Sequence, residues 1–149
     1  MTERGRAQGE RMLAEELQAT GTQELVERVH RSFLPLNARH GVISTRWQLK
    51  PTSWDPRAFN DHTDPVWDHD VLTELEAVDA EFGLLAGQLA EALQRFDGYA
   101  RRHATAVTRA RAGQHAWVDA PDRDSCQLVW IQFHEDLLAS LGIPRGSDA

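Results

Sequence analysis

The sequence has few of the features that mark secreted, membrane-bound or disulfide-stabilised proteins. Its 149 residues include one cysteine, Cys126, which excludes an internal disulfide and any metal site built on paired cysteines. No apolar run approaches the ~20 residues that a membrane-spanning helix needs. The amino-terminal stretch is polar, unlike a secretory signal. We therefore expect a soluble, cytoplasmic protein that does not bind membranes.

Positive charge is also scarce. The chain has 16 lysines and arginines against 23 aspartates and glutamates, which gives a formal net charge of −7. Because nucleic-acid binding relies on clustered cationic side chains that displace counterions from phosphates, we expect no nucleic-acid partner. A loose match to a DNA-binding helix-turn-helix at 13–29 fits badly, since its second helix carries Glu24 and Glu27 where phosphates would lie.

Apolar residues at helical spacing open the chain. A first short helix around Met12 is expected to stop near Gly21, because glycine commonly follows the last turn of a helix. A second amphipathic helix begins after Thr22 as its N-cap. Pro35 is expected to end or kink this helix, because proline lacks the backbone N–H that the helix interior needs.

Strict alternation of two faces over 42–50 predicts a half-buried strand. A lone strand leaves its backbone groups unpaired, and 115–118 is the other short candidate, so we expect a small two-stranded element. The proline-rich loop that follows is expected to pack Trp54 and Phe59 against the domain. The face of the strand predicted to be buried consists of Ile43, Thr45, Trp47 and Leu49.

The strongest pattern is an unbroken heptad of apolar residues between Val71 and Ala106. A helix over 71–107 would be about 55 Å long at 1.5 Å per residue. A compact domain of this length is only about 38 Å across. The helix must therefore bend, most plausibly at one of its glycines, or project so that another chain covers its apolar seam. The glycines in question are Gly83, Gly87 and Gly98.

The charges along this helix predict how two copies would pair. Nine acidic residues and no lysine or arginine lie in 61–91, whereas five arginines and one acid lie in 95–111. An antiparallel pair sets each acidic half against a basic half, so we expect a homodimer of antiparallel long helices. The alternative is that the chain's own terminal helix covers the seam. The predicted interface residues are Leu75, Phe82, Leu85, Leu89 and Phe96.

The last element, over 124–141, is interpreted as a helix although its centre is rich in branched and aromatic residues. Polar residues recur in it at steps of three to four, Asp124 or Ser125 supplies an N-cap, and Gly142 supplies a stop. Its apolar residues cover a wide surface, which is typical of a central core helix.

The segment 60–70, NDHTDPVWDHD, is the main candidate for chemistry. One interpretation is a capped acidic helix start, with Asp64 as N-cap before a proline and carboxylates in the first turns. A second is a divalent-metal site of His62, His69, Asp64 and Asp68, although the seven-residue spacing of the histidines matches no named zinc motif. A third is a patch that binds a protein partner.

Other candidates have simpler explanations. His134-Glu135 lacks the second histidine of a zinc-protease helix, since Leu138 occupies that position. His103 on the heptad seam is expected to pack, and Cys126 to act as a small buried hydrophobe. Phosphate-binding, dinucleotide-binding and nucleophile-elbow motifs are all lacking, so no catalytic residue and no cofactor is predicted.

The sequence therefore predicts one mainly α domain over 1–149, with flexible tails at 1–9 and 143–149. Its fold is a helical bundle built around one long heptad-patterned helix, with a small two-stranded β element. The function favoured is a protein-binding, regulatory or assembly protein that acts through helical self-association and partner contacts. Two alternatives remain: a metal-dependent hydrolase with a His/Asp site near 61–70, and an acidic immunity- or antitoxin-type protein that neutralises a basic partner.

Overall fold

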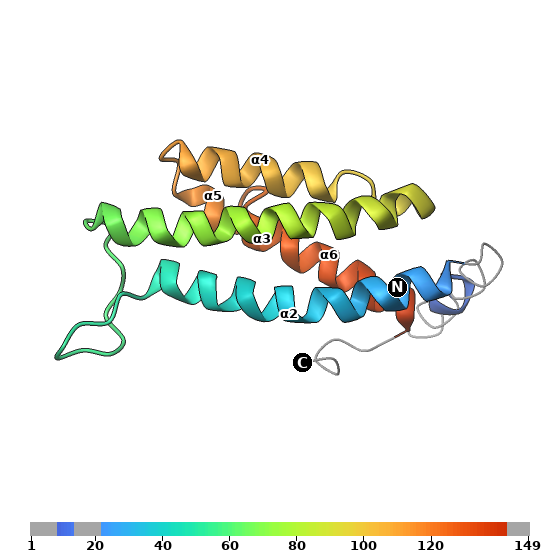
Figure 1. Cartoon of the computed structure of the whole chain (residues 1–149), viewed down its shortest axis with the longest axis horizontal. Coiled ribbons are helices and arrows are strands. Elements are labelled where there is room, and N and C mark those ends of the chain that lie inside the picture. Colours follow the sequence, from blue (N-terminus) through green and yellow to red (C-terminus); the bar gives the residue numbers. More distant parts are fainter. Residues whose placement is uncertain (1–8, 14–21, 143–149) are drawn as a thin grey trace.

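The computed structural model describes residues 9–13 and 22–142, and helices dominate throughout (Figure 1). The elements named here are α2 (Gln23–Gln48), α3 (Pro65–Ala92), a 3-10 turn η1 (Gln94–Phe96), α4 (Tyr99–Arg111), α5 (Ala116–Asp119) and α6 (Cys126–Leu141). Residues 9–13 are also helical. None of the described helices combines the length and apolar character that crossing a bilayer demands.

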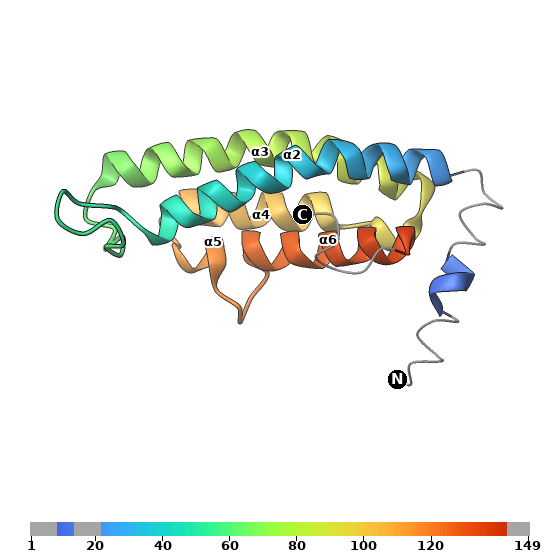
Figure 2. The same ribbon diagram turned by 90° about the horizontal axis from the view of Figure 1, so that it is seen from below.

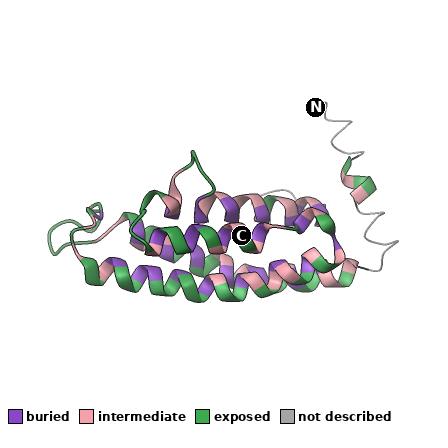
Figure 3. Ribbon diagram, turned by 90° about the horizontal axis from the view of Figure 1, so that it is seen from above, coloured by how far each residue is buried: buried purple, intermediate pink, exposed green. Residues whose placement is uncertain are grey.

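The helices form two layers around one core. α2 and α3 pack along each other as one layer, and α4, α5 and α6 make the other (Figure 2). Buried faces turn inward between the layers, whereas the outer faces are exposed (Figure 3). The loop 49–64, the start of α3, the end of α4 and α5 lie at one end of the bundle (Figure 1).

The predicted β element is wrong, because the described residues contain no strand. Residues 42–48 are the last turns of α2, and 116–119 form the short helix α5. In place of a hairpin, the described chain has one isolated bridge, between Leu49 and Phe59. The bundle is entirely helical apart from its connecting segments.

The reason for the misreading lies in α2 itself. A period of two and a period of 3.6 both place residues i and i+4 on one face, so Ile43 and Trp47 satisfied either pattern. Thr45, which a strand would have buried with them, is exposed and donates its hydroxyl to the Gly41 carbonyl one turn back. Pro35 lies inside α2 on its exposed side and does not end the helix. The buried residues of α2 keep heptad spacing past this proline: Val26, Val29, Phe33, Leu36, His40, Ile43 and Trp47.

The long heptad helix is broken into two. α3 ends at Ala92, and after η1 the chain reverses and α4 begins behind Gly98, whose φ of 91° is the left-handed conformation that glycine adopts most readily. Gly98, one of three predicted bend sites, is thus at the break, whereas Gly83 and Gly87 lie inside α3. α4 packs back along α3, so the chain covers much of its own seam.

α6 is a central core helix, as its pattern predicted. Ser125 is its N-cap and accepts from the Leu128 N–H, and Gly142 ends it at a φ of 68°. Trp130, Phe133 and Leu137 are each at most 3% exposed. Of the predicted tails 1–9 and 143–149, Gly9 alone is described, and it is helical. The predicted stop near Gly21 lies outside the described residues.

The loop 49–64 differs from expectation. Trp54 and Phe59 were expected to pack against the domain, but each is 85% exposed. The loop is held by backbone hydrogen bonds near its ends, from Lys50 N–H to the Ala58 carbonyl and from Asn60 N–H to the Gln48 carbonyl. These bonds position the segment that follows, which carries His62.

Candidate metal centre

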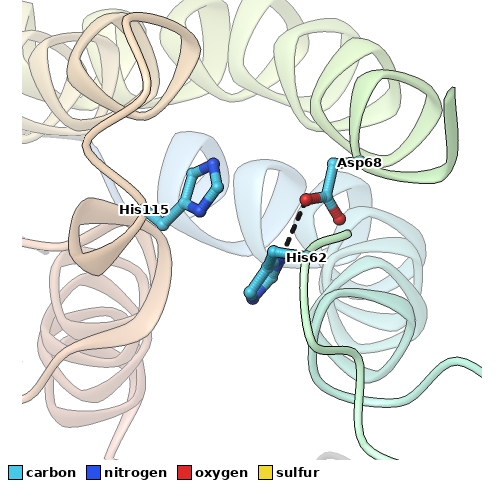
Figure 4. A group of neighbouring side chains, drawn as sticks. All are labelled: His62, Asp68 and His115. Carbon is cyan, nitrogen blue, oxygen red and sulfur yellow. Dashed lines mark hydrogen bonds and ion pairs between the residues drawn. The ribbon is translucent and has the colours of Figure 1, made fainter. Parts of the chain in front are cut away.

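Three metal-ligand side chains from three separate segments meet at one end of the bundle. His62 comes from the loop before α3, Asp68 from the first turn of α3, and His115 from the turn between α4 and α5 (Figure 4). One potential ligand atom from each lies within 4.8 Å of the other two. Two imidazoles and one carboxylate are a ligand set suited to zinc and other divalent transition metals.

The carboxylate of Asp68 is already oriented by two neighbours. Its Oδ2 lies 2.8 Å from Nδ1 of His62, and its Oδ1 accepts from Nδ2 of Asn60 at 2.9 Å. Asn60 is itself 8% exposed and donates its other amide hydrogen to the Trp47 carbonyl at 2.9 Å. Such partners fix the orientation of ligands and commonly strengthen metal binding.

Asn60 also shapes the backbone at His62. Its Oδ1 accepts the His62 N–H at 3.0 Å, a turn in which an asparagine side chain stands in for backbone. His62 has a φ of 59°, the one left-handed conformation at a residue other than glycine in the described chain. Such backbone costs roughly 1–3 kcal/mol and tends to be found where function requires a particular orientation. The turn aims the imidazole at Asp68.

The floor of the site is aromatic. The Trp47 ring, 2% exposed, lies 4.4 Å from the His62 ring and 5.1 Å from the His115 ring between centroids. The two imidazoles are 4.8 Å apart. An apolar floor lowers the local dielectric and strengthens electrostatic interactions above it.

The spacing of the three side chains fits a metal after a small closure. Ligand atoms on a tetrahedral zinc at about 2.0–2.1 Å lie about 3.3 Å from one another. In this structure the three potential ligand atoms lie within 4.8 Å of one another. His115 is exposed and sits in a turn just after Gly113, so it is the side chain best placed to move inward.

Two open pockets flank the cluster. A pocket of about 380 Å³ is bounded by Trp47, His62, His115 and the acid Asp119. On the other side, a pocket of about 330 Å³ is bounded by all three ligand residues together with His69 and Arg111. A small molecule therefore has access to the cluster.

The structure divides the four predicted metal residues into two pairs. His62 and Asp68 meet in the cluster. Asp64 instead caps α3, with its carboxylate accepting from Val66 N–H and Trp67 N–H. His69 is exposed beside Arg111, whose Nη1 lies 3.3 Å from its Nδ1. Both interpretations of 60–70 therefore describe part of it: Asp64 is a helix cap, and Asp68 is a candidate ligand.

Sequence reasoning missed His115, because no spacing connects it to His62. The two residues meet only because α4 returns along α3 and brings its carboxyl end beside the amino end of α3. That reversal depends on the break near Gly98, one of three glycines at which the sequence allowed a bend without distinguishing among them. The segment of His115 was moreover interpreted as a strand.

The predicted dimer-interface residues lie within the bundle. Leu75, Phe82, Leu89 and Phe96 are each at most 1% exposed, and Leu85 is partly buried. A homodimer stays a prediction, but these side chains are covered by the chain itself and a dimer would need another surface.

A second group of titratable side chains is buried in the core. His103 is fully buried on the seam, with Nδ1 2.7 Å from Asp79 Oδ1 and Nε2 3.4 Å from Nε2 of His40. His40 stacks on Trp130 at 4.0 Å. Burial, and then repulsion from His103, lowers the pKa of His40 to about 3. Burial likewise raises the pKa of Cys126 to about 12, so this thiol is a packed hydrophobe, as predicted.

No known protein family, curated protein or solved structure matches the chain. The fold and the cluster are therefore the grounds for assigning a function.

Proposed function

We propose that this protein binds a divalent transition-metal ion through His62, Asp68 and His115, and that it is a metal-dependent hydrolase. The observation that supports this is the convergence of two imidazoles and one buried carboxylate within 4.8 Å, beside open pockets. Three protein ligands leave a coordination position for water or substrate, which is the arrangement of catalytic rather than structural zinc sites.

The chemistry follows from that open position. His62, Asp68 and His115 would hold the ion, which would lower the pKa of a bound water and polarise the oxygen of the bond to be cleaved. Water could then add to a carbonyl or phosphoryl centre near neutral pH, with the leaving group taking up a proton. In this proposal Asn60 is a positioning residue, because it orients both His62 and Asp68.

Protons compete with the metal. His62 Nδ1 and Asp68 Oδ2 are joined by a hydrogen bond of 2.8 Å, and an ion held by these two residues would displace its proton. Metal affinity should accordingly fall as pH is lowered.

The test is zinc binding by isothermal titration calorimetry, with elemental analysis of the dialysed protein. We expect one zinc per chain in the wild type and a loss of at least tenfold in affinity for His115→Ala, since this variant lacks one of the three proposed protein ligands. His115 is the best position to change, because its exposure makes unfolding of the variant a small risk.

The matched control is Asp64→Ala, which removes a neighbouring carboxylate that caps α3 and pairs with Lys50 outside the cluster. It should lower the free energy of unfolding by about 0.5–2 kcal/mol and leave zinc affinity unchanged. Zinc binding that survives His115→Ala, or that is lost in Asp64→Ala, would refute this ligand set. The hydrolase assignment is tested separately, by turnover of ester, amide and phosphate-ester substrates with and without zinc.

A further inference from the structure

Arg111, the last residue of α4, lies in the wall of the pocket that contains all three proposed ligands. Its Nε donates to Glu76 Oε1 at 2.8 Å, and its Nη1 lies 3.3 Å from His69 Nδ1 and 3.5 Å from the His69 carbonyl. These contacts hold the guanidinium in place. Within the part of the chain that the structure describes, Nη2 makes no hydrogen bond.

The charge of this pocket depends on the metal. Without an ion, Arg111 is paired with Glu76, and Asp68 lies against His62. A divalent ion would add positive charge that these pairs do not balance. An anion should therefore bind more tightly when the metal is present, in contact with both the ion and the guanidinium.

We propose that Arg111 is a specificity-determining residue that binds an oxyanion, so that the substrate is a small molecule with a phosphoryl or carboxylate group at the metal. The inference rests on the proposed function, since it takes the metal as the second partner of the anion. Arginine suits the role because its planar guanidinium presents fixed N–H donors that match the oxygens of phosphate and carboxylate. The contacts with Glu76 and His69 fix the orientation of the guanidinium before an anion binds, which lowers the conformational entropy lost on binding.

The other flanking pocket does not offer the same chemistry. The residues around it include the acid Asp119 and no lysine or arginine. Asp119 is further engaged by Gln48, whose Nε2 donates to its Oδ2 at 3.1 Å. An anion is therefore directed to the Arg111 side of the cluster, and a neutral or cationic portion of the substrate to the Asp119 side.

Thermodynamic linkage provides a test that needs no substrate. If an anion binds between the metal and Arg111, it must strengthen zinc binding by the same factor by which zinc strengthens anion binding. The experiment measures zinc affinity by titration calorimetry, with methylphosphonate or acetate present and absent. Methylphosphonate reports on phosphoryl recognition and acetate on carboxylate recognition.

In the wild type, the preferred anion should raise zinc affinity by roughly 5–150-fold, the usual range for coupled sites. In Arg111→Gln this factor should fall towards one, because the loss of one charge-assisted hydrogen bond weakens anion binding by about tenfold. Each variant serves as its own reference, because only the ratio with and without the anion is compared. Arg109→Gln is the matched control: Arg109 is on the same helix, stacks on Trp117 and is not part of the pocket.

Three outcomes separate the possibilities. An increase in zinc affinity with the anion that is lost in Arg111→Gln but kept in Arg109→Gln supports the proposal. The anion with the larger effect shows whether the substrate carries a phosphoryl or a carboxylate group. If zinc binds but neither anion changes its affinity, or if the anion has the same effect in Arg111→Gln as in the wild type, Arg111 has no specificity role. The proposed metal site is not affected by that result. Absence of zinc binding in the wild type refutes both the metal site and this inference.

Discussion

Two aspartates four residues apart show how similar residues acquire different roles. Asp64 and Asp68 both fall in an acidic helix start, and sequence patterns treat them alike. Asp64 precedes the proline at the first helical position, where its carboxylate satisfies two backbone N–H groups. Asp68 is one turn later on the inner face, 7% exposed, where it accepts from Asn60 and pairs with His62. The capping role of Asp64 could be predicted from local sequence. The contacts of Asp68 inside the bundle could not, because they depend on Asn60 and on the turn at His62.

His40 is a second residue whose role depends on its surroundings. It was given no role from the sequence, yet it occupies a heptad position of α2 and is 4% exposed between Trp130 and His103. The signal that could have found it was the seven-residue repeat of apolar side chains on either side. Pro35, which was expected to end or kink the helix, lies in the middle of that repeat and obscures it in the sequence.

The first prediction concerns the pH dependence of stability. The pKa of His40 is about 3 in the folded protein and returns to its ordinary value of 6.5 on unfolding. Above that pH the imidazole is neutral in both states and has no effect. As pH falls from 6.5 towards 3, only the unfolded chain gains the proton, so this group lowers the free energy of unfolding by about 1.4 kcal/mol per pH unit.

Urea unfolding at several pH values between 7 and 5 measures this slope. His40→Gln, which retains a hydrogen-bonding side chain beside His103, should be less sensitive to pH than the wild type. Leu84→Ala is the control, because this side chain does not titrate and is 70% exposed on α3, so the slope should be unchanged. A wild type and a His40→Gln variant with parallel pH profiles would show that His40 takes up its proton inside the folded protein.

At the scale of elements, the sequence predicted helices well where more than one signal agreed. α6 was predicted because its polar spacing, an N-cap at Asp124 or Ser125 and a stop at Gly142 all favoured a helix, and the structure places the cap at Ser125. The end of α2 was misread because periodicity was the only signal, and over seven residues two periods fit. α5 is a four-residue helix, too short to leave a periodic pattern.

The second prediction tests α6 as the centre of the core. Leu137 is fully buried, so Leu137→Ala leaves a cavity and should lower the free energy of unfolding by about 2–5 kcal/mol. Leu84→Ala, at a position 70% exposed on α3, is the control and should change it by less than about 0.5 kcal/mol. Thermal or urea unfolding measures both. Similar losses in the two variants would mean that α6 is peripheral.

For the whole molecule, the charge pattern that suggested an antiparallel dimer is explained within one chain. The acidic half of the heptad region became α3 and the basic half became α4, and the reversal near Gly98 sets them antiparallel. Arg111 pairs with Glu76, and His103 with Asp79, across this contact. The physical argument for antiparallel pairing therefore holds, but a turn in the chain supplies the second helix. Sequence patterns predicted which surfaces must meet, and could not tell whether one chain or two would bring them together.

The third prediction separates these two arrangements directly. Leu89 is fully buried in the seam, so a charge placed there in the folded bundle is desolvated without a partner, and Leu89→Glu should prevent folding. Leu84→Glu, on the outer face of the same helix, should fold like the wild type. Circular dichroism reports folding, and light scattering reports the mass of each protein against 16.8 kDa for one chain. The opposite result would be a wild-type dimer and a Leu89→Glu variant that is a folded, stable monomer. It would show that the seam is an interface between two chains, and that α3 and α4 do not pack on each other within one chain.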